Sequence, residues 1–453
     1  MRSNSLLPAL ALAFVPMVGF AQSNVRDFGA KGDGRTDDTA AFQRALNERG
    51  QQGGGIVSVP PGKYLIATHL AIPTGVTLEG GWRAPATVQQ YHDPADPKGG
   101  PALDGSVLLA TEGAGNAAGT PFITLHTNSC LKGVTVFYPN QTKTNPPVAY
   151  PWTVAAPGTD NPSIVDVLMV NPYQAVDFSN TAGRHYIRGL YAQALYRGLV
   201  VDICLDIGRL EDIHFWPFWT AADSNSPAQE FTLKQGIAFT FARADWEYVT
   251  NCFCIGYHMG YRFVKSTHPT LGAPANVLLT QSGADLSEIA VQVDDSQAHA
   301  GISFSNAQIF GDVIVAPTNS GMVRFTGCGL FGSLDGARGT ALAKLAGRGR
   351  VSFDNCHFYC IDPKDKGAAT ILVEGGRLSV NGCVFINSRN TAGVNCNPVP
   401  IVLEPDVISA VITGNEFYGA ANIRNRARGR VVIANNVEQT DEDPYLAKSA
   451  PGK

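Results

Sequence analysis

The chain has 453 residues, with 34 Lys and Arg against 38 Asp and Glu, 48 Gly, 28 Pro and 9 Cys. Hydrophobic residues make up 44% of the chain and charged residues 16%, which excludes a disordered protein because a core of ordinary size is available. The net charge of −4 lacks the basic excess that nucleic-acid binders need, so no nucleic-acid partner is expected. High glycine content with few charges favours an all-β fold that has many tight turns.

The first residues predict a secretion signal. Arg2 precedes an almost wholly apolar run from Leu6 to Phe20, and small residues follow it. Pro8 and Pro16 interrupt the run, which is short for a membrane span. We therefore predict a signal peptide over residues 1–23, a secreted or periplasmic protein, and no membrane partner.

The next segment, DFGAKGDGRTDDT at residues 27–39, combines a glycine-rich loop with residues that start helices. Asp37 and Asp38 are typical of a helix N-terminus, and the apolar residues between 42 and 46 recur at helical spacing. The sequence predicts a short amphipathic helix that covers the open end of a stack of strands.

A six-residue pattern recurs beyond residue 130, reading apolar, any, Asn/Gly/Asp, apolar or Cys, any, apolar. Its third position is occupied by Gly133, Asp166, Gly189, Asp212, Asn251, Asn306, Gly327, Asn355, Gly382, Gly414 and Asn435. The intervals range from 21 residues (306 to 327) to 55 residues (251 to 306), and the longest predicts a degenerate turn near Leu279. This recurrence predicts a β-solenoid, in which each turn stacks on the next as one elongated domain.

Two further columns support this register. Seven residues after four of the turns stand Tyr173, Tyr196, Trp219 and His258, and nine residues after the same turns stand Ala175, Gly198, Ala221 and Gly260. The spacing predicts an aromatic column beside a column of small residues.

The repeat also places the cysteines. Cys252, Cys328, Cys356 and Cys383 directly follow turn residues, where the side chain points inward, so we expect a buried stack of small hydrophobic groups. Disulfides within such a stack stay open as an alternative, although parallel Cβ vectors give poor geometry. Cys and His residues lack metal-ligand spacing, so no metal and no cofactor are expected.

Four blocks near the N-terminus carry a resemblance: residues 27–39, GGG at 53–55, PPGKY at 60–64 and GVTLEG at 75–80. Together they resemble the N-terminal segment of the pectate-lyase superfamily, in its rhamnogalacturonase/epimerase-like branch. The resemblance implies a single-stranded right-handed parallel β-helix with an N-terminal capping helix, in a carbohydrate-active enzyme or a phage tailspike. It also implies structural roles for Asp33, Asp37 and Asp38, and it makes a homotrimer plausible.

With the resemblance, the chain divides into a signal peptide (1–23), an N-terminal cap with the first turns (24–80), a β-helix body with inserted loops (81–438) and a C-terminal tail (439–453). Polygalacturonase-type hydrolases carry Asn-Thr-Asp, Asp-Asp, Gly-His-Gly and Arg-Ile-Lys blocks in order. This chain offers Asp294-Asp295 as an Asp-Asp block and lacks the other three. The resemblance therefore implies the fold and the carbohydrate class without a pectin-specific mechanism.

The longest interruption of the rhythm, residues 216–248, concentrates three of the five tryptophans with several acids. Long loops on a regular solenoid usually carry function, and aromatic rings beside carboxylates suit sugar recognition. We predict the catalytic residues Asp223, Glu230, Asp245 and, ranked last, Glu247. The predicted substrate-binding residues, with Asp177 and Arg262 facing one groove beneath the insertion, are Asp177, His214, Trp216, Trp219, Arg243, Trp246, Tyr257, His258 and Arg262. An alternative stays open, in which the aromatic side chains only pack the loop against the coils and the acids are solvated.

Two chemistries would cleave a glycan in such a site. Hydrolysis uses two carboxylates, one of them protonated, whereas β-elimination needs an acidic sugar, a basic side chain and a cation that neutralises the uronate. The abundance of carboxylates favours a glycoside hydrolase acting on a polysaccharide or oligosaccharide. A lyase or epimerase acting on a uronic-acid glycan, and a non-catalytic glycan-binding or tailspike-like module, remain alternatives.

Overall fold

The computed structural model describes residues 22–81, 103–180, 182–221, 225–333, 341–361, 367–386 and 398–439. Almost all of the expected signal peptide, the predicted catalytic residue Asp223 and the tail from residue 440 onward lie outside these ranges. None of the described helices is long and apolar enough to cross a membrane.

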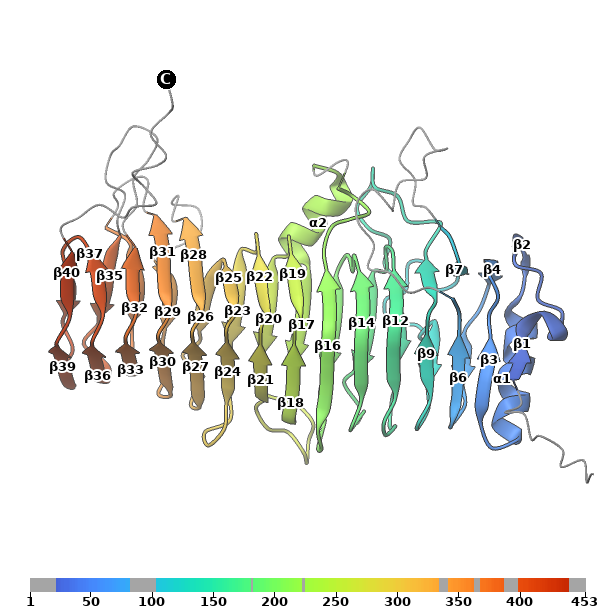
Figure 1. The fold of residues 1–453 in the computed structure, drawn as a ribbon, viewed down its shortest axis with the longest axis horizontal. Coiled ribbons are helices and arrows are strands. Elements are labelled where there is room, and N and C mark those ends of the chain that lie inside the picture. The colour runs from blue at the N-terminus through green and yellow to red at the C-terminus, as the bar shows by residue number, and fades with distance from the viewer. Residues whose placement is uncertain are drawn as a thin grey trace, which may run out of the picture.

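The predicted parallel β-helix is confirmed (Figure 1). In the described part of the chain, two sheets run the length of the molecule, one of 27 strands and one of 13, and all of their named strand pairings are parallel. We call the larger one the front sheet and the smaller one the back sheet. Each coil passes through the front sheet, crosses to the back sheet and returns to start the next coil.

The strands have the following bounds. The front sheet contains β1 (Gln22–Asn24), β2 (Asp33–Asp37), β3 (Gly55–Ser58), β4 (Gly62–Ile66), β6 (Val76–Glu79), β7 (Ser106–Ala110), β9 (Cys130–Lys132), β10 (Thr135–Phe137), β12 (Ser163–Met169), β14 (Tyr186–Ala192), β16 (Gly208–Phe215), β18 (Asp245–Thr250), β19 (Phe253–Ile255), β21 (Asn276–Thr280), β22 (Gly283–Asp285), β24 (Ile302–Ser305), β25 (Gln308–Phe310), β27 (Met322–Thr326), β28 (Gly329–Ser333), β30 (Arg350–Asp354), β31 (His357–Ile361), β33 (Gly376–Asn381), β34 (Val384–Ile386), β36 (Val407–Thr413), β37 (Glu416–Tyr418), β39 (Arg430–Ala434) and β40 (Val437–Gln439). The back sheet contains β5 (Leu70–Ile72), β8 (Ile123–Leu125), β11 (Trp152–Ala155), β13 (Gln174–Phe178), β15 (Arg197–Val201), β17 (Ile237–Phe241), β20 (Met259–Phe263), β23 (Ile289–Val293), β26 (Asp312–Val315), β29 (Ala341–Leu345), β32 (Ala369–Val373), β35 (Val399–Leu403) and β38 (Ile423–Asn425).

The front sheet is folded along a line of one-residue bends. Each turn residue that the repeat pattern predicted lies at one of these bends. All eleven turn residues found in the sequence have a positive φ, between 52° at Asn306 and 67° at Gly414. The degenerate turn expected near Leu279 is Gln281, with a φ of 51°. Only glycine adopts this left-handed conformation freely, and Asn and Asp tolerate it better than other residues, which explains the choice of residue at the bends.

The residue after each bend points into the core, as predicted for the cysteines. Cys252, Cys328, Cys356 and Cys383 are buried, and all eight cysteines in the described ranges are free thiols. In several coils this side chain also accepts a hydrogen bond from the backbone N–H of the same position one coil earlier. These bonds are Cys252 N to Ser282 Oγ (3.1 Å), Cys356 N to Cys383 Sγ (3.4 Å), Cys383 N to Asn415 Oδ1 (2.9 Å) and Asn415 N to Asn436 Oδ1 (3.0 Å).

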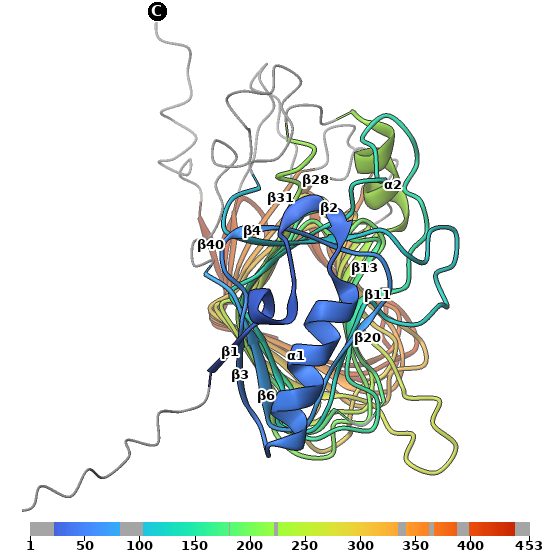
Figure 2. The same ribbon diagram turned by 90° about the vertical axis from the view of Figure 1, so that its right-hand side faces the viewer.

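The N-terminal end is capped as the sequence predicts (Figure 2). A short 3-10 helix, η1 (Val25–Phe28), leads to β2, and helix α1 (Thr39–Gln51) then buries Phe42, Ala45 and Leu46 against the first coils. The Asp38 carboxylate accepts the backbone N–H groups of Lys31 (2.7 Å) and Gly32 (3.0 Å), so it organises the glycine-rich loop. Asp33 and Asp37 likewise bind local N–H and hydroxyl groups, which is a structural role.

The insertion is shorter than predicted. The extra residues run from 216 to 236 and contain helix α2 (Pro227–Gln235), whereas residues 237–241 form the regular strand β17. As a result, the aromatic column continues from Tyr196 to Phe231 of α2, with ring centroids 5.8 Å apart, and Trp219 is not part of it. The small-residue column likewise continues through Ala238 of β17 and not through Ala221.

Candidate functional site

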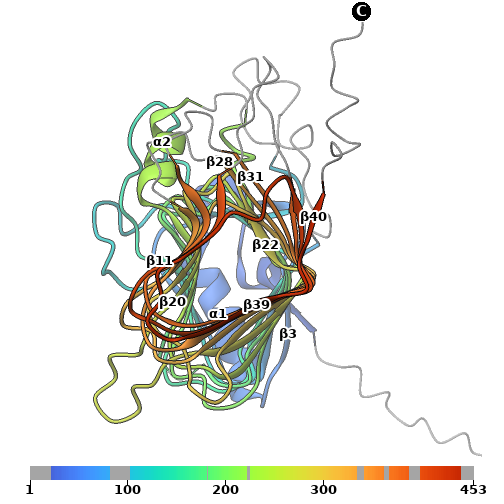
Figure 3. The same cartoon turned by 90° about the vertical axis from the view of Figure 1, so that its left-hand side faces the viewer.

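The predicted site residues lie on two opposite edges of the β-helix. Loops that lead from the front sheet to the back sheet form the upper edge in Figure 1, which carries α2. Loops that return from the back sheet to the front sheet form the lower edge. Seen along the axis, α2 and the loop 264–275 project at opposite ends of the back-sheet side (Figures 2 and 3). The described acids of residues 216–248 therefore do not come together in one site: Glu230 lies on α2 at the upper edge, whereas Asp245 and Glu247 lie on β18, which begins at the lower edge.

On the upper edge, the insertion is mainly a packed cover. Trp219 is buried with Phe218 and Ala228 in a small cluster that joins α2 to the coils, so it cannot stack on a sugar from solvent. Tyr257 is also buried, and burial raises the pKa of its hydroxyl well above the usual range. This part of the prediction is corrected: both side chains support the loop.

The remaining upper-edge residues keep some exposure. The His214 and Trp216 rings stack at 5.7 Å, and burial lowers the pKa of His214. Glu230 lies in the first turn of α2 and pairs with Lys234 at 3.2 Å, as a solvent-facing helical ion pair. His258 Nδ1 lies 2.9 Å from Glu288 Oε2. In the described part of this edge, Glu230 therefore pairs with a lysine and not with a second carboxylate.

Asp177 and Arg262 face outward from the back sheet, as predicted, in one column through Val200 and Thr240. They are three coils apart, which corresponds to about 14 Å at the usual strand spacing. Arg262 donates to Asp294 Oδ2 of the next coil, at 2.9 Å from Nη2, and so already has a carboxylate partner. The two residues therefore do not share one binding position.

A groove on the lower edge brings together the strongest set of chemical groups. It has a volume of 770 Å³ and lies where the loops 202–207, 242–244, 264–275, 294–301 and 316–321 of five successive coils meet. Its charged and aromatic lining residues are Asp206, Arg243, Asp245, Trp246, Lys265, Asp295 and His299. Three of these, Arg243, Asp245 and Trp246, were predicted from the sequence.

The acids of this groove are held by hydrogen-bond donors. Asp245 accepts from Arg243 Nη2 (2.8 Å) and from Gln297 Nε2 (3.2 Å). Asp295 accepts the backbone N–H groups of Ser296 (3.0 Å) and Ser320 (3.2 Å). These hydrogen bonds fix the orientation of both side chains in the groove.

Two basic side chains of the groove stand apart from these contacts. Lys265 and His299 are exposed, and neither makes a hydrogen bond or an ion pair with the described part of the chain. Trp246 stands beside them with 55% of its surface exposed, although its φ of 74° is unusual for any residue with a side chain. A free lysine, a free histidine and an exposed indole in one groove suit an anionic sugar, which offers a carboxylate and an apolar ring face.

Glu247, the lowest-ranked catalytic prediction, is fully buried below this groove. Its Oε1 lies 2.8 Å from Nε2 of His185, which is also fully buried. Together with Cys204 they form the one group in the described ranges whose ligand atoms would suit a metal ion, all within 4.8 Å of one another. Glu247 has no path to a substrate, so its predicted catalytic role is corrected to an internal contact.

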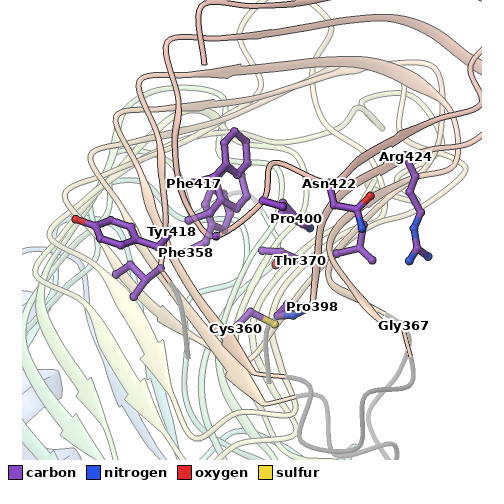
Figure 4. Close-up of a pocket in the computed structure, with 15 residues that line it drawn as sticks. Phe358, Cys360, Gly367, Thr370, Pro398, Pro400, Phe417, Tyr418, Asn422 and Arg424 are labelled. Carbon is purple, nitrogen blue, oxygen red and sulfur yellow. The ribbon is translucent and has the colours of Figure 1, made fainter. Parts of the chain in front are cut away.

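A second pocket lies near the C-terminal end, on the upper edge (Figure 4). It is smaller, with a volume of 250 Å³, and its lining is mostly aromatic and aliphatic, including Phe358, Phe417 and Pro400. Arg424 is the one charged residue among the described residues that line it. It offers no acid and base together, so the lower-edge groove is the better candidate for chemistry.

Sequence reasoning missed Lys265, His299 and the groove role of Asp206 and Asp295. One signal was available: the 55-residue interval between Asn251 and Asn306 holds two consecutive long return loops, 264–275 and 294–301. Long loops on adjacent coils form one side of a groove when they lie on the same edge. The single insertion at 216–236 covers only its own part of the opposite edge.

Comparisons with known proteins agree with this fold. Residues 22–209 match the family described as "Rhamnogalacturonase A/epimerase, pectate lyase-like". The chain is 54% identical over 44 residues to "Alginate lyase 7" of Azotobacter vinelandii, a match that covers 10% of this chain and 5% of that protein. It is 38% identical over 82 residues to "Mannuronan C5-epimerase AlgE4" of the same organism, covering 17% of this chain and 15% of that protein. The chain thus spans only a small part of these relatives.

A solved structure extends the likeness to nearly the whole chain. The N-terminal fragment of bacteriophage Phi29 gene product 12 aligns with a TM-score of 0.55 and 13% identity, over 91% of this chain and 71% of that one. At this identity the alignment shows the fold alone. The chain is a parallel β-helix protein whose residues 22–209 match the family described as "Rhamnogalacturonase A/epimerase, pectate lyase-like".

Proposed function

We propose that this chain is a carbohydrate-active enzyme that acts on a uronic-acid glycan bound in the lower-edge groove. The observation that carries the proposal is the grouping of Lys265, His299 and Trp246 in one groove: two basic side chains that have no partner among the described residues, and an exposed ring. The names of the relatives, an alginate lyase and a mannuronan epimerase, support an acidic substrate. Export of the protein and its assembly as a homotrimer stay predictions.

The basic groups of the groove favour proton abstraction. Lys265 and His299 line the groove together, and abstraction beside a uronate carboxylate needs one base and one cation. A neutral Lys265 or His299 would take the proton from the carbon beside the uronate carboxylate, while the other, charged, neutralises that carboxylate. In a lyase, the bond between the next carbon and the glycosidic oxygen then breaks, a carbon–carbon double bond forms, and the oxygen takes a proton and leaves as a hydroxyl group of the released chain. In an epimerase, a proton returns to the same carbon from the opposite face.

Glycoside hydrolysis is the second candidate, because three carboxylates, those of Asp206, Asp245 and Asp295, line the same groove. The carboxyl of Asp206 is the most exposed of them, at 58%. In this case an acid of the groove would have to gain a proton when the substrate displaces water.

One experiment separates these outcomes. The protein is incubated with polymannuronate, pectate and neutral dextran, and the products are followed by ultraviolet absorbance, reducing ends and deuterium incorporation from heavy water. Unsaturated ends indicate a lyase, saturated reducing ends a hydrolase, and deuterium at unchanged chain length an epimerase. Retention on the glycan without any product would identify a binding module, and absence of both would contradict the proposal.

Variants connect the activity to the groove. Lys265→Ala and His299→Ala should each lower turnover of the acidic glycan by about a hundredfold, the usual range for a general acid or base. Lys234→Ala is the matched control, since Lys234 is an exposed lysine on α2 at the opposite edge. Equal activities in the three variants would place the site elsewhere.

A further inference from the structure

An unusual polar column crosses the interior directly beneath the groove. Strand pairing aligns His185, Gly208 and Glu247 on three successive coils, since Tyr186 pairs with Arg209 and Gly208 pairs with Glu247. The histidine and the glutamate are both fully buried and meet across the glycine. A Cβ atom on Gly208 would lie 2.2 Å from Glu247 Oε2, so only glycine leaves room for this contact.

The contact is short and sealed from solvent. His185 Nδ1 lies 2.6 Å from the carbonyl oxygen of Ala182, which only accepts, so this nitrogen donates. Its Nε2 lies 2.8 Å from Oε1 of Glu247, and one proton between these two atoms ties the side chains together. Removal of one partner would leave a buried polar group unpaired, so the contact resists separation of the two strands.

The strand that carries Glu247 is distorted at the groove. The pairing of β18 with β21 shifts its register between Asp245 and Glu247, and the residue between them, Trp246, has a φ of 74°. A tryptophan adopts this conformation only where its surroundings impose it. On one side Asp245 is fixed by Arg243 and by its N–H bond to the Cys204 carbonyl (2.8 Å), and on the other side Glu247 is fixed by His185.

We propose that the buried His185–Glu247 hydrogen bond is a strut that holds Trp246 in its strained, exposed conformation, and that the indole is the platform on which a sugar ring of the substrate stacks. His185 and Glu247 are positioning residues in this account, and Trp246 touches the substrate. The stacking of a sugar on Trp246 rests on the proposed function. The positioning of Trp246 by His185 and Glu247 does not depend on any substrate.

Tryptophan fluorescence tests the strut without a substrate. Subtraction of the Trp246→Phe spectrum isolates the emission of Trp246 from that of the other four tryptophans. Glu247→Gln should change the acrylamide quenching and the emission maximum of Trp246 while the other four stay constant. Glu230→Gln, an acid on the exposed face of α2, is the matched control and should change neither. An unchanged Trp246 signal in folded Glu247→Gln protein would overturn the strut.

A second measurement holds even if the Glu247→Gln variant is poorly folded. Because glycine adopts a positive φ without strain, Trp246→Gly should have a higher unfolding midpoint in urea than Trp246→Ala. In the His185→Gln background the backbone is released, so this difference should shrink. Equal midpoints for the Gly and Ala variants in the otherwise unchanged chain would contradict a strained, imposed conformation.

Binding of mannuronate and galacturonate oligosaccharides tests the platform. Trp246→Ala should weaken binding by about tenfold, as for a central aromatic contact, whereas Trp246→Tyr should retain most of the affinity. Loss of the strut should raise KM more than it lowers kcat. If the unaltered protein binds neither oligosaccharide, the proposed function and the platform fail together, and the fluorescence result still decides the strut.

Metal analysis supplies a third outcome. His185, Cys204 and Glu247 place one ligand atom each within 4.8 Å, and an N, S and O donor set suits zinc. Purified protein should contain no stoichiometric zinc, and a chelator should leave the Trp246 signal unchanged. One zinc per chain that a chelator removes, with a change in that signal, would replace the direct His185–Glu247 contact by a metal site and overturn the strut as stated.

Discussion

Arg262 and Asp294 form an ion pair between neighbouring coils on the outer face of the back sheet, with 2.9 Å between Nη2 and Oδ2. The next residue, Asp295, lies past the end of β23 and faces the lower-edge groove. The Asp-Asp block that the sequence offered as a sign of hydrolase chemistry is thus divided between two surfaces. One acid is a structural partner, and only the other is available to a substrate.

The first prediction concerns the acids. Asp245→Asn should lower turnover of the true substrate by about a hundredfold, because it removes the charge that orders Arg243 in the groove. Glu230→Gln should leave turnover unchanged, because Glu230 lies on the opposite edge and pairs only with Lys234. Steady-state kinetics of the two variants check this. A loss in Glu230→Gln with normal Asp245→Asn would return the site to the insertion.

The second prediction concerns salt. Attraction between exposed Lys265 and His299 and an acidic oligosaccharide is screened by salt, with a Debye length of about 10 Å at 0.1 M. Affinity for the acidic oligosaccharide should therefore fall steadily with added sodium chloride, measured by calorimetry, and the fall should be shallower in Lys265→Ala. A salt-independent affinity would mean that charge plays little part in recognition.

The third prediction concerns the cysteine column. Burial raises the pKa of the Cys252 thiol to about 12, and Cys328, Cys356 and Cys383 are buried beside it. Thiol reagents at pH 8 should label none of these four until the protein unfolds, as measured by mass spectrometry. Rapid labelling of the native protein would contradict the inward column.

The fourth prediction concerns the bends. Asn306 has a φ of 52°, so Asn306→Gly should be close to neutral in unfolding free energy. Asn306→Val should destabilise by about 1–2 kcal/mol, the cost of left-handed backbone for a residue with a bulky Cβ. Urea denaturation of both variants provides the test. Equal stabilities would show that the bend relaxes to another conformation.

The fifth prediction concerns the glycine in the polar column. Gly208→Ala should destabilise by about 1–3 kcal/mol, because its Cβ overlaps the Glu247 carboxylate. Gly183→Ala is the control, since a Cβ there meets only Asp160 Oδ1 at 3.8 Å. Similar unfolding midpoints for the two alanine variants would mean that Glu247 rotates away at little cost.

The fold was largely predictable because it depends on local rules repeated many times. A residue such as Asn355 or Gly382 is needed wherever the backbone bends, and the residue after it is needed wherever the core must be filled. These constraints recur in each coil, so the sequence alone located the bends, the inward cysteines and the capping helix.

The candidate site was only partly predictable, because it depends on which edge each loop joins. Residues 216–248 look like one insertion, yet β17 lies between Glu230 and Asp245 and carries the chain across the molecule. Lys265 and His299 meet in the groove through the stacking of loops that are far apart in the sequence. No local pattern distinguishes a free lysine in a groove from a solvated lysine elsewhere.

Among the hydrogen bonds at the bends, one set joins a backbone amide to a side chain of the following coil. The amide of Cys383 is satisfied by Asn415 of the following coil, and the amide of Asn415 is satisfied by Asn436 of the coil after that. Each coil is therefore completed by residues that leave the ribosome after it. During synthesis, the bend amide of the last completed coil therefore has no side-chain acceptor until the next coil forms. A chain that ends early in this region would expose that amide to solvent.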